Sequence, residues 1–285
     1  MTRIVLCCGT GGVGKTTTAA AVGVAWALSG QRACVLTIDP ARRLADALGL
    51  DGLDNTPRPV TLDGEDVPEG GSLHAMMLDR KATFDDAIRR MAEDEASADR
   101  LLANRYYRAV STKLTGSQEY MATEKLNELV QSGRFDVVIV DTPPSQHAIE
   151  FFHAPARIQK LFDGPVVRRL VQPGRGLTGG GTRRILRSVL SLVGRDVLED
   201  IGEFFRLMSH ASSGFADNSA AVAEQLRSDN TTLLLVTTPA SAARAGALAF
   251  VEHAKSDGLS VDGVAITRFI SSAGVSDNTW TSGPP

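Results

Sequence analysis

The stretch that decides the fold is GTGGVGKTT, residues 9–17, which follows the apolar run IVLCC at residues 4–8. The apolar run predicts a short buried strand that ends abruptly at glycine. An Ala-rich segment then runs from Thr16 to Ser29, with apolar residues all round and Gly30 as a stop, which predicts a buried helix. Residues 33–38 form a second apolar run. Together these segments make one βαβ unit and therefore predict a parallel sheet.

Residues 9–16 fit the pattern G-x-x-x-x-G-K-[ST] without a mismatch, in the strand–loop–helix context that the pattern requires. Glycines let consecutive backbone N–H groups turn toward an anion, and the following helix adds its own unpaired N–H groups. Lys15 would reach the β and γ phosphates, Thr16 would ligate Mg²⁺, and Thr17 would reach the α-phosphate. We therefore predict a site for ATP with Mg²⁺. The residues expected to form it are Gly9, Thr10, Gly11, Gly12, Val13, Gly14, Lys15, Thr16 and Thr17.

Two carboxylates stand at the ends of apolar runs. Asp141 closes residues 137–140, which is the Walker B arrangement, in which a carboxylate holds Mg²⁺ through water. Asp39 closes the second predicted strand. Ligands of open parallel sheets bind beyond the carboxyl ends of the strands, so both side chains are expected to face the bound phosphates.

Length, charge and composition limit the classes of function. The chain has 285 residues, a formal net charge of −3 and 43% apolar residues, an ordinary globular balance. A general nucleic-acid binder needs an excess of Lys and Arg, so no nucleic-acid partner is expected. No apolar stretch approaches the ~20 residues that span a bilayer, and the N-terminus carries no signal-peptide pattern. Three cysteines make no disulfide framework, so we predict a cytoplasmic protein.

The rest of the chain predicts an α/β fold: a mostly parallel P-loop NTPase sheet flanked by helices, with an inserted helical subdomain. Residues 51–71 are rich in Asp, Pro and Gly and are interpreted as a surface loop. Further strands are predicted at 73–78, 135–140, 232–237 and 263–266, and helical patterns at 81–132, 148–162, 197–208 and 240–256. We expect one P-loop ATPase domain over residues 1–270, with helical insertions at about 80–132 and 150–228, and a disordered tail at 271–285.

The segment at residues 165–195 is unusual in composition. It carries seven arginines and no acidic residue, interleaved with Val, Leu and Ile. This composition suits an anionic membrane surface or a switchable client-binding element. A solvated cationic loop that caps the core explains the same pattern equally well.

At this point the motifs resemble a known family. Residues 11–17, GGVGKTT, look like the deviant Walker A motif shared by the MinD, ParA, nitrogenase-iron-protein and arsenite-pump ATPases. Residues 37–41, TIDPA, with Leu44 and Asp46 after them, resemble switch I of the ArsA branch. That branch contains the arsenite-translocating ATPase and the ATPase that targets tail-anchored membrane proteins. Residues 141–144, DTPP, followed by His147, look like its switch II. The likeness is strongest to bacterial anion-transporting ATPases of this branch.

The resemblance implies a mechanism. Members of the family are dimers that clamp nucleotide near the subunit interface, and hydrolysis opens the clamp. Carried over by position, Asp39 would orient or deprotonate the attacking water, Lys15 would act on the phosphates, and Asp141 would support Mg²⁺. Residues 143–147 would couple the γ-phosphate to the helical region. The function implied is an ATP-hydrolysing switch that serves a protein client or a membrane partner, the latter with peripheral membrane association. A ParA/MinD-like positioning ATPase and a nucleotide-sensing subunit of a heterodimer are the alternatives.

The departures from the family pattern are equally informative. The signature lysine of the family, which reaches the nucleotide of the partner, is replaced by Thr10. A neutral hydroxyl cannot offset charge that develops in the transition state, so the chain is expected to be slow as a homodimer or to pair with a paralogue that carries the lysine. The adenine-contacting Asn-Arg of the family is Thr267-Arg268 here.

The cysteines do not suit metal chemistry. No Cys-x-x-Cys occurs, so the interfacial zinc site of some relatives is not expected. Cys7, Cys8 and Cys34 are predicted on adjacent strands beside the P-loop, as small buried residues. Arsenite transport, which needs several convergent thiols, is therefore not expected.

Overall fold

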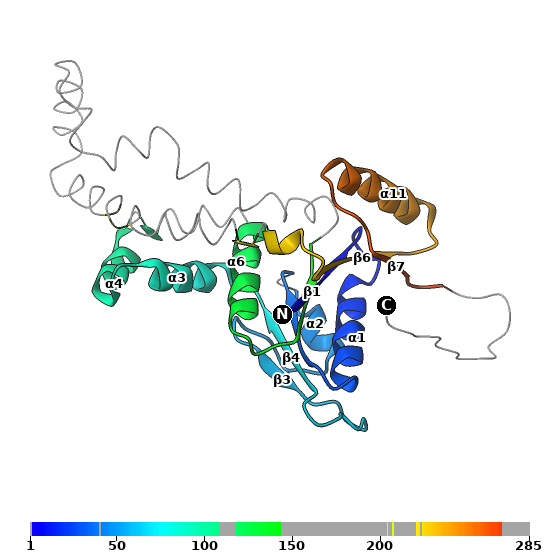
Figure 1. Cartoon of the computed structure of the whole chain (residues 1–285), viewed down its shortest axis with the longest axis horizontal. Coiled ribbons are helices and arrows are strands. Elements are labelled where there is room, and N and C mark those ends of the chain that lie inside the picture. Colours follow the sequence, from blue (N-terminus) through cyan, green and yellow to red (C-terminus); the bar gives the residue numbers. More distant parts are fainter. Residues whose placement is uncertain are drawn as a thin grey trace, which may run out of the picture.

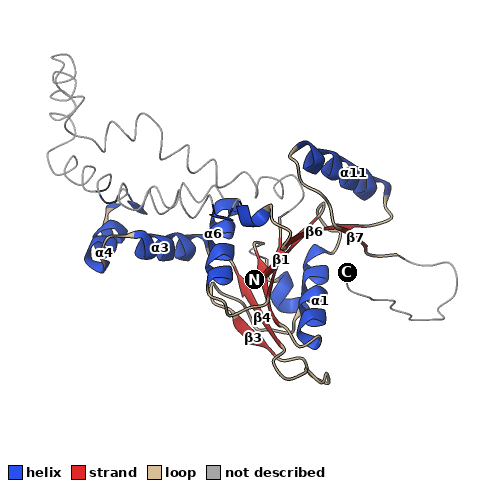
Figure 2. Cartoon of the chain, in the orientation of Figure 1, coloured by secondary structure: helices blue, strands red, loops and turns tan. Residues whose placement is uncertain are grey.

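The computed structural model describes residues 2–39, 41–105, 107–108, 118–143, 204, 207, 221–222 and 224–269. Strands and helices alternate through most of this part of the chain (Figures 1 and 2). The strands are β1 (Arg3–Cys8), β2 (Arg32–Thr37), β3 (Arg58–Val60), β4 (Ser72–Met77), β5 (Val137–Asp141), β6 (Thr231–Thr237) and β7 (Gly263–Ile266). The helices are α1 (Lys15–Leu28), α2 (Arg43–Ala47), α3 (Arg80–Met91), α4 (Glu95–Ala103), α6 (Gln118–Gln131) and α11 (Ser241–Ser256).

The strands form one sheet in the order β3-β4-β2-β5-β1-β6-β7. All neighbours are parallel except β3 and β4, which are antiparallel. The predicted fold class is confirmed: the structure is a mostly parallel α/β sheet flanked by helices. The prediction of an uninterrupted loop over residues 51–71 is wrong, because β3 lies inside it. This three-residue edge strand contains Pro59, which an edge position tolerates because no further ladder bond is required of it.

The two faces of the sheet bury different side chains, as the period-two geometry of strands requires. In β1, Ile4, Leu6 and Cys8 belong to a core shared with α3, α6 and α11, whereas Val5 and Cys7 belong to a core shared with α1. Figure 2 shows α6 and α1 on opposite sides of the strands. The sheet is therefore the middle layer of three, and both of its faces are buried.

The three cysteines are buried, as predicted. Their predicted placement on adjacent strands is wrong, because β5 lies between β1, which carries Cys7 and Cys8, and β2, which carries Cys34. Burial raises the pKa of all three thiols, and to about 12 for Cys8 and Cys34. Inert buried thiols of this kind serve packing rather than metal binding or redox chemistry.

Helices α3 and α6 are joined by an ion-pair network. Arg90 of α3 lies 2.8 Å from Glu124 and 3.0 Å from Glu128 of α6. Lys125, whose side chain is 2% exposed, lies 2.8 Å from Glu128. Figure 1 shows α3 and α4 projecting away from the sheet. The network thus fixes this projecting pair to α6, which itself packs on the core.

Several predicted features lie outside the described residues. They are Pro144 and His147 of the predicted switch II, the helix at 148–162, most of the insertion at 150–228 with its Arg-rich segment 165–195, and the tail at 271–285. Within the described chain, none of the helices has both the length and the apolar character to cross a membrane.

Candidate functional site

The loop after β1 wraps tightly against the neighbouring strand. A Cβ added to Gly9 would lie 2.2 Å from the carbonyl oxygen of Val236 in β6, so no other residue fits there. Gly14 takes a φ of 91° directly before α1, a left-handed conformation that favours glycine. These two positions bend the chain sharply between strand and helix, and they leave the first amides of α1 facing the carboxyl edge of the sheet.

Lys15 is the first residue of α1, and its side chain turns back over the loop. Its Nζ donates a hydrogen bond to the carbonyl oxygen of Thr10 at 2.9 Å. Burial lowers the pKa of Lys15, while the nearby charge of Asp141 opposes that shift. A lysine held by one backbone carbonyl keeps further N–H donors for an anion.

Asp141 lies at the centre of the carboxyl edge, at the last position of β5. In the parallel ladders it is paired in register with Thr37 of β2 and with Cys7 of β1. One carboxylate oxygen accepts hydrogen bonds from the hydroxyls of Thr16, at 2.8 Å, and Thr37, at 3.0 Å. Burial raises the pKa of Asp141, and the two hydroxyl hydrogen bonds and the charge of Lys15 counteract that rise.

Asp39 follows β2 on the same edge and is connected to Asp141 through Thr37. The hydroxyl of Thr37 donates to Asp141 and accepts from the backbone N–H of Asp39 at 3.3 Å. The Asp39 carboxylate accepts from the backbone N–H of Ala41 at 3.0 Å, and from the guanidinium of Arg43 at 3.0 Å. The Arg43 and Asp39 side chains are 69% and 32% exposed, so this pair contributes only ~0.2–1 kcal/mol.

The other end of the edge is formed by the residues after β7. Thr267 donates a hydrogen bond from its hydroxyl to the carbonyl oxygen of Val13, inside the P-loop. Arg268 follows with a φ of 53°, the left-handed region that non-glycine residues rarely adopt. The Thr267 hydroxyl is therefore occupied by the protein backbone, while the exposed Arg268 borders open space.

These groups surround a cavity of about 530 Å³ at the carboxyl edge of the sheet. Most residues predicted for the site line it, whereas Gly9, Thr10, Val13 and Thr267 do not. The methyl group of Thr10 is directed at α11, where a Cβ added to Gly246 would lie 2.5 Å from it. The lining residues are Gly11, Gly12, Gly14, Lys15, Thr16, Thr17, Asp39, Arg43, Asp46, Asp141, Thr142, Pro143 and Arg268.

The sequence interpretation missed Arg43 and the bridging role of Thr37. Arg43 stands four residues after Asp39, at the first position of α2, close enough in the chain for the two side chains to meet. Thr37 is the last residue of β2, at the end where a parallel sheet gathers functional groups. Both signals are present in the chain, but neither distinguishes a functional group from an ordinary surface or cap residue.

The oxygen groups around Asp141 fit Mg²⁺ bound together with phosphates. In nucleotide sites Mg²⁺ is held by one or two carboxylates plus substrate phosphates and water. Thr16 and Asp141 place a hydroxyl and a carboxylate oxygen 2.8 Å apart. No cluster of three or more His, Cys, Asp or Glu side chains suited to an ion occurs in the described part of the chain. The donor set therefore suits a magnesium ion that arrives with its nucleotide.

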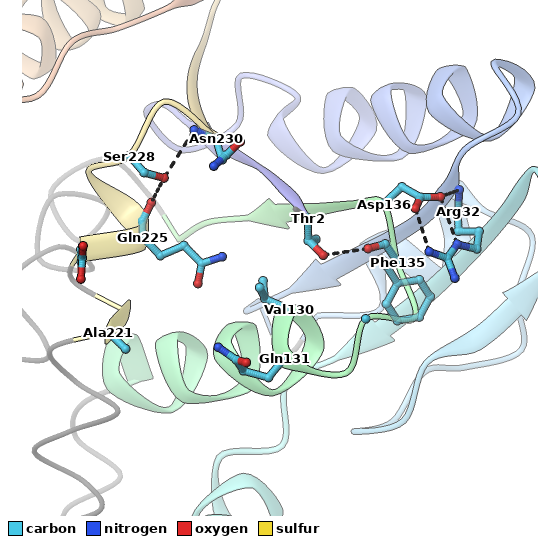
Figure 3. A pocket seen from close by; sticks show the side chains of 12 residues that line it. Thr2, Arg32, Val130, Gln131, Phe135, Asp136, Ala221, Gln225, Ser228 and Asn230 are labelled. Carbon is cyan, nitrogen blue, oxygen red and sulfur yellow. Dashed lines mark hydrogen bonds and ion pairs between the residues drawn. The ribbon is translucent and has the colours of Figure 1, made fainter.

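A second cavity of about 610 Å³ lies at the opposite end of the sheet, near the amino ends of β1, β2 and β5 (Figure 3). Its Arg32 and Asp136 are paired at 2.8 Å, and Arg32 lowers the pKa of Asp136 to about 2. The hydroxyl of Thr2 donates a hydrogen bond to the carbonyl oxygen of Phe135 at 2.9 Å. Ligands of parallel sheets bind at the carboxyl ends of strands, so the cavity beside Lys15 is the candidate site.

Comparison with known proteins identifies the family of the chain. The family model of the anion-transporting ATPases (ArsA ATPase) matches residues 2–240, which include the P-loop, Asp39 and Asp141 but end before Thr267. The "ATPase get3" of Aspergillus terreus is 24% identical over 217 residues, covering 70% of this chain and 58% of that protein. The "ATPase GET3" of Malassezia globosa is 26% identical over 208 residues, covering 71% and 59%. The chain thus spans less than two thirds of the length of these relatives. A match over most of the chain shows that it belongs to the anion-transporting ATPase family.

Proposed function

We propose that the chain binds ATP with Mg²⁺ in the cavity beside Lys15 and hydrolyses it to ADP and phosphate. The observation that carries this proposal is the meeting of three groups at one carboxyl edge. They are the P-loop lysine, the Thr16–Asp141 pair suited to Mg²⁺, and the carboxylate of Asp39. Phosphate cradle, metal site and candidate base surround one space, which is the arrangement that phosphoryl transfer requires. The relatives named ATPases support the same activity.

Each group has a role in the proposed reaction. Lys15 holds the β and γ phosphates, Thr17 the α-phosphate, and Thr16 with Asp141 (through water) holds Mg²⁺, which supplies positive charge to the phosphate oxygens. Asp39 orients the water and accepts its proton. The water oxygen forms a bond to the γ-phosphorus, and the bond to the β–γ bridging oxygen breaks, with its electron pair leaving on ADP.

The direction of the nucleotide follows from the strand order. Asp39 and Asp141 lie beyond β2 and β5, on one side of β1, whereas Thr267 and Arg268 lie beyond β7, on the other. We therefore place the terminal phosphate toward β5 and β2, and the base toward β7. In this orientation Arg268 lies on the base side, and Thr267 positions the P-loop rather than the base, because its hydroxyl already bonds Val13.

We further propose a dimeric switch that couples its nucleotide state to a protein client or a membrane partner. Thr10 supports slow turnover as a homodimer, or a heterodimer with a paralogue that carries the signature lysine. A nucleotide-sensing subunit with weak catalysis is the second candidate, favoured by the same residue. The proposed organisation is one ATPase domain over 1–270 with helical insertions and a tail at 271–285. The proposed location is the cytoplasm, with peripheral membrane association if the partner is a membrane.

Binding and hydrolysis can be tested separately on purified protein. Calorimetry should show Mg-ATP binding that Lys15→Ala weakens by about tenfold or more, since a P-loop lysine meets two phosphates. Lys255→Ala, at an exposed position of α11, is the matched control and should bind as wild type does. Asp39→Asn should keep binding but lose about 10²- to 10⁴-fold in phosphate release, the usual contribution of a positioned base. Native mass measurement on the same samples reports the oligomer. Failure of the wild type to bind Mg-ATP would contradict the proposal.

A further inference from the structure

The charged side chains that line the nucleotide cavity are balanced among the described residues. Lys15, Arg43 and Arg268 are the cations, and three aspartates oppose them. A bound nucleoside triphosphate with its terminal phosphate in transfer carries much more negative charge than this lining neutralises. The position of each cation along the carboxyl edge therefore decides which part of the nucleotide it can stabilise.

Arg43 is on the side of the cavity where hydrolysis is expected. It follows β2, next to β5 with Asp141, whereas Arg268 follows β7 at the far end of the sheet order. Its guanidinium lies 3.0 Å from Asp39, the residue proposed to orient the water. Its charge also reaches the phosphate lysine: burial is the main cause that lowers the pKa of Lys15, and Arg43 lowers it further. Arg43 is thus close to both the base and the phosphate lysine.

The ion pair between Asp39 and Arg43 is weak enough for Arg43 to exchange Asp39 for a phosphate group. The pair is solvent-screened, with the Arg43 side chain 69% exposed. A phosphoryl group offers a guanidinium more charge and a bidentate partner, for which arginine is better suited than lysine. Movement of Arg43 to the phosphate would also release the Asp39 carboxylate to accept a hydrogen bond from water. One movement of the Arg43 side chain would therefore complete two parts of the site together.

Thr10 cannot provide this charge. Its side chain is neutral, its methyl group is directed at Gly246 of α11, and the residue does not line the cavity. From these contacts we infer that Arg43 is a catalytic residue supplied in cis, which leaves Asp39 and stabilises the γ-phosphoryl group in the transition state. This inference rests on the proposed ATP hydrolysis. A chain with threonine at position 10 is expected to turn over slowly, and the inference is that the turnover it retains depends on Arg43.

The test compares Arg43→Gln with Arg42→Gln. Arg42 is the adjacent exposed arginine, and its guanidinium donates to the carbonyl oxygen of Asp51, away from the cavity. For each protein, calorimetry measures the affinity for Mg-ATP and for Mg-ADP with aluminium fluoride, a mimic of the phosphoryl group in transfer. Phosphate release gives the turnover. Arg43→Lys tests whether the single ammonium group of lysine can substitute for the planar, bidentate guanidinium of arginine.

Arg43→Gln should weaken the aluminium fluoride complex and slow turnover by about 10²-fold or more, with Mg-ATP affinity within about threefold of wild type. Arg43→Lys should fall between, and Arg42→Gln should match wild type. Equal losses of Mg-ATP and aluminium fluoride binding would overturn the inference, because they indicate uniform binding rather than catalysis. So would an Arg43→Gln protein that behaves as Arg42→Gln does. A wild type that binds no Mg-ATP contradicts the proposed function itself, whereas normal Mg-ATP binding with no Arg43 effect overturns only the inference.

Discussion

The hydroxyl of Thr267 donates a hydrogen bond to the backbone carbonyl oxygen of Val13, which lies 254 residues earlier in the chain. The same hydroxyl lies 3.3 Å from the carbonyl oxygen of Thr237, and the Thr267 amide donates to that oxygen at 2.9 Å. One side chain after β7 therefore holds the P-loop against the end of β6. The end of β7 and the P-loop are therefore connected through this residue.

Thr267→Val should loosen this connection without changing the shape of the residue. We expect the KM for ATP to rise about fivefold, since a hydrogen bond of this kind contributes ~1 kcal/mol. Steady-state phosphate release measures the change. Thr267→Ser keeps the hydroxyl and should retain a wild-type KM, so a loss in both variants would indicate that packing, rather than the bond to Val13, fixes the loop.

Asp141→Asn should slow turnover strongly but stabilise the protein without nucleotide. Because burial raises the pKa of Asp141 in the fold, its ionisation opposes folding at neutral pH, and an amide oxygen can still accept from Thr16 and Thr37. We expect a gain on the order of 1 kcal/mol, or about 2–4 °C in Tm, with at least ~10²-fold slower phosphate release.

The pH dependence gives the control for Asp141→Asn. The penalty of ionising Asp141 is absent below its unfolded pKa of 3.8 and grows as the pH rises through the higher folded value. The stability advantage of the variant, measured by denaturant unfolding, should therefore shrink as the pH falls toward 3.8. An advantage that does not change with pH would show that it has another cause.

Arg90→Met should destabilise the contact between α3 and α6. Glu124 is 3% exposed and would lose a cation at 2.8 Å, so we expect a loss of about 1–3 kcal/mol in the free energy of unfolding. Arg89→Met is the matched control, because Arg89 pairs with the 63% exposed Asp99 and its loss should stay within about 0.5 kcal/mol. Equal losses in the two variants would mean that burial of Glu124 does not matter. Urea unfolding of both proteins measures the difference.

Thr10→Lys should raise the turnover of the pure protein by about tenfold or more, if the missing cation limits hydrolysis. Thr10→Met adds comparable length without charge and should give no gain. In the proposed dimer this lysine would reach the nucleotide of the partner, so the gain should grow with protein concentration. A lysine variant no faster than the methionine variant would count against the proposed dimer. A wild-type homodimer that is already fast would count against slow turnover.

The local elements of the site are predictable because short-range chemistry determines them. Gly9 and Gly14 occupy positions where a side chain clashes or the backbone turns left-handed, and such positions mark the strand–loop–helix unit directly in the sequence. The positions of Asp39 and Asp141 near the ends of strands are predictable, because in each case an apolar run stops at a carboxylate. The α/β class follows from the alternation of such runs with helical patterns.

Features that depend on pairing between strands far apart in the chain could not be predicted from these local patterns. The insertion of β5 between β1 and β2 separates Cys34 from Cys7 and Cys8, and nothing in the local pattern of those runs specifies it. The same register brings Thr37 opposite Asp141 and so creates the bridge between the two carboxylates. Arg43 was missed because an exposed arginine four residues after an aspartate is common on any protein surface.

The close approach of Thr10 to Gly246 has an evolutionary consequence. A side chain at position 246 would meet whatever stands at position 10, since its Cβ would already lie 2.5 Å from the threonine methyl group. A descendant that first acquires a bulkier residue at 246 makes a later lysine at 10 difficult to accommodate. A descendant that first acquires the lysine comes under selection to keep the glycine. The order of the two mutations would thus decide whether a lysine can be introduced at position 10.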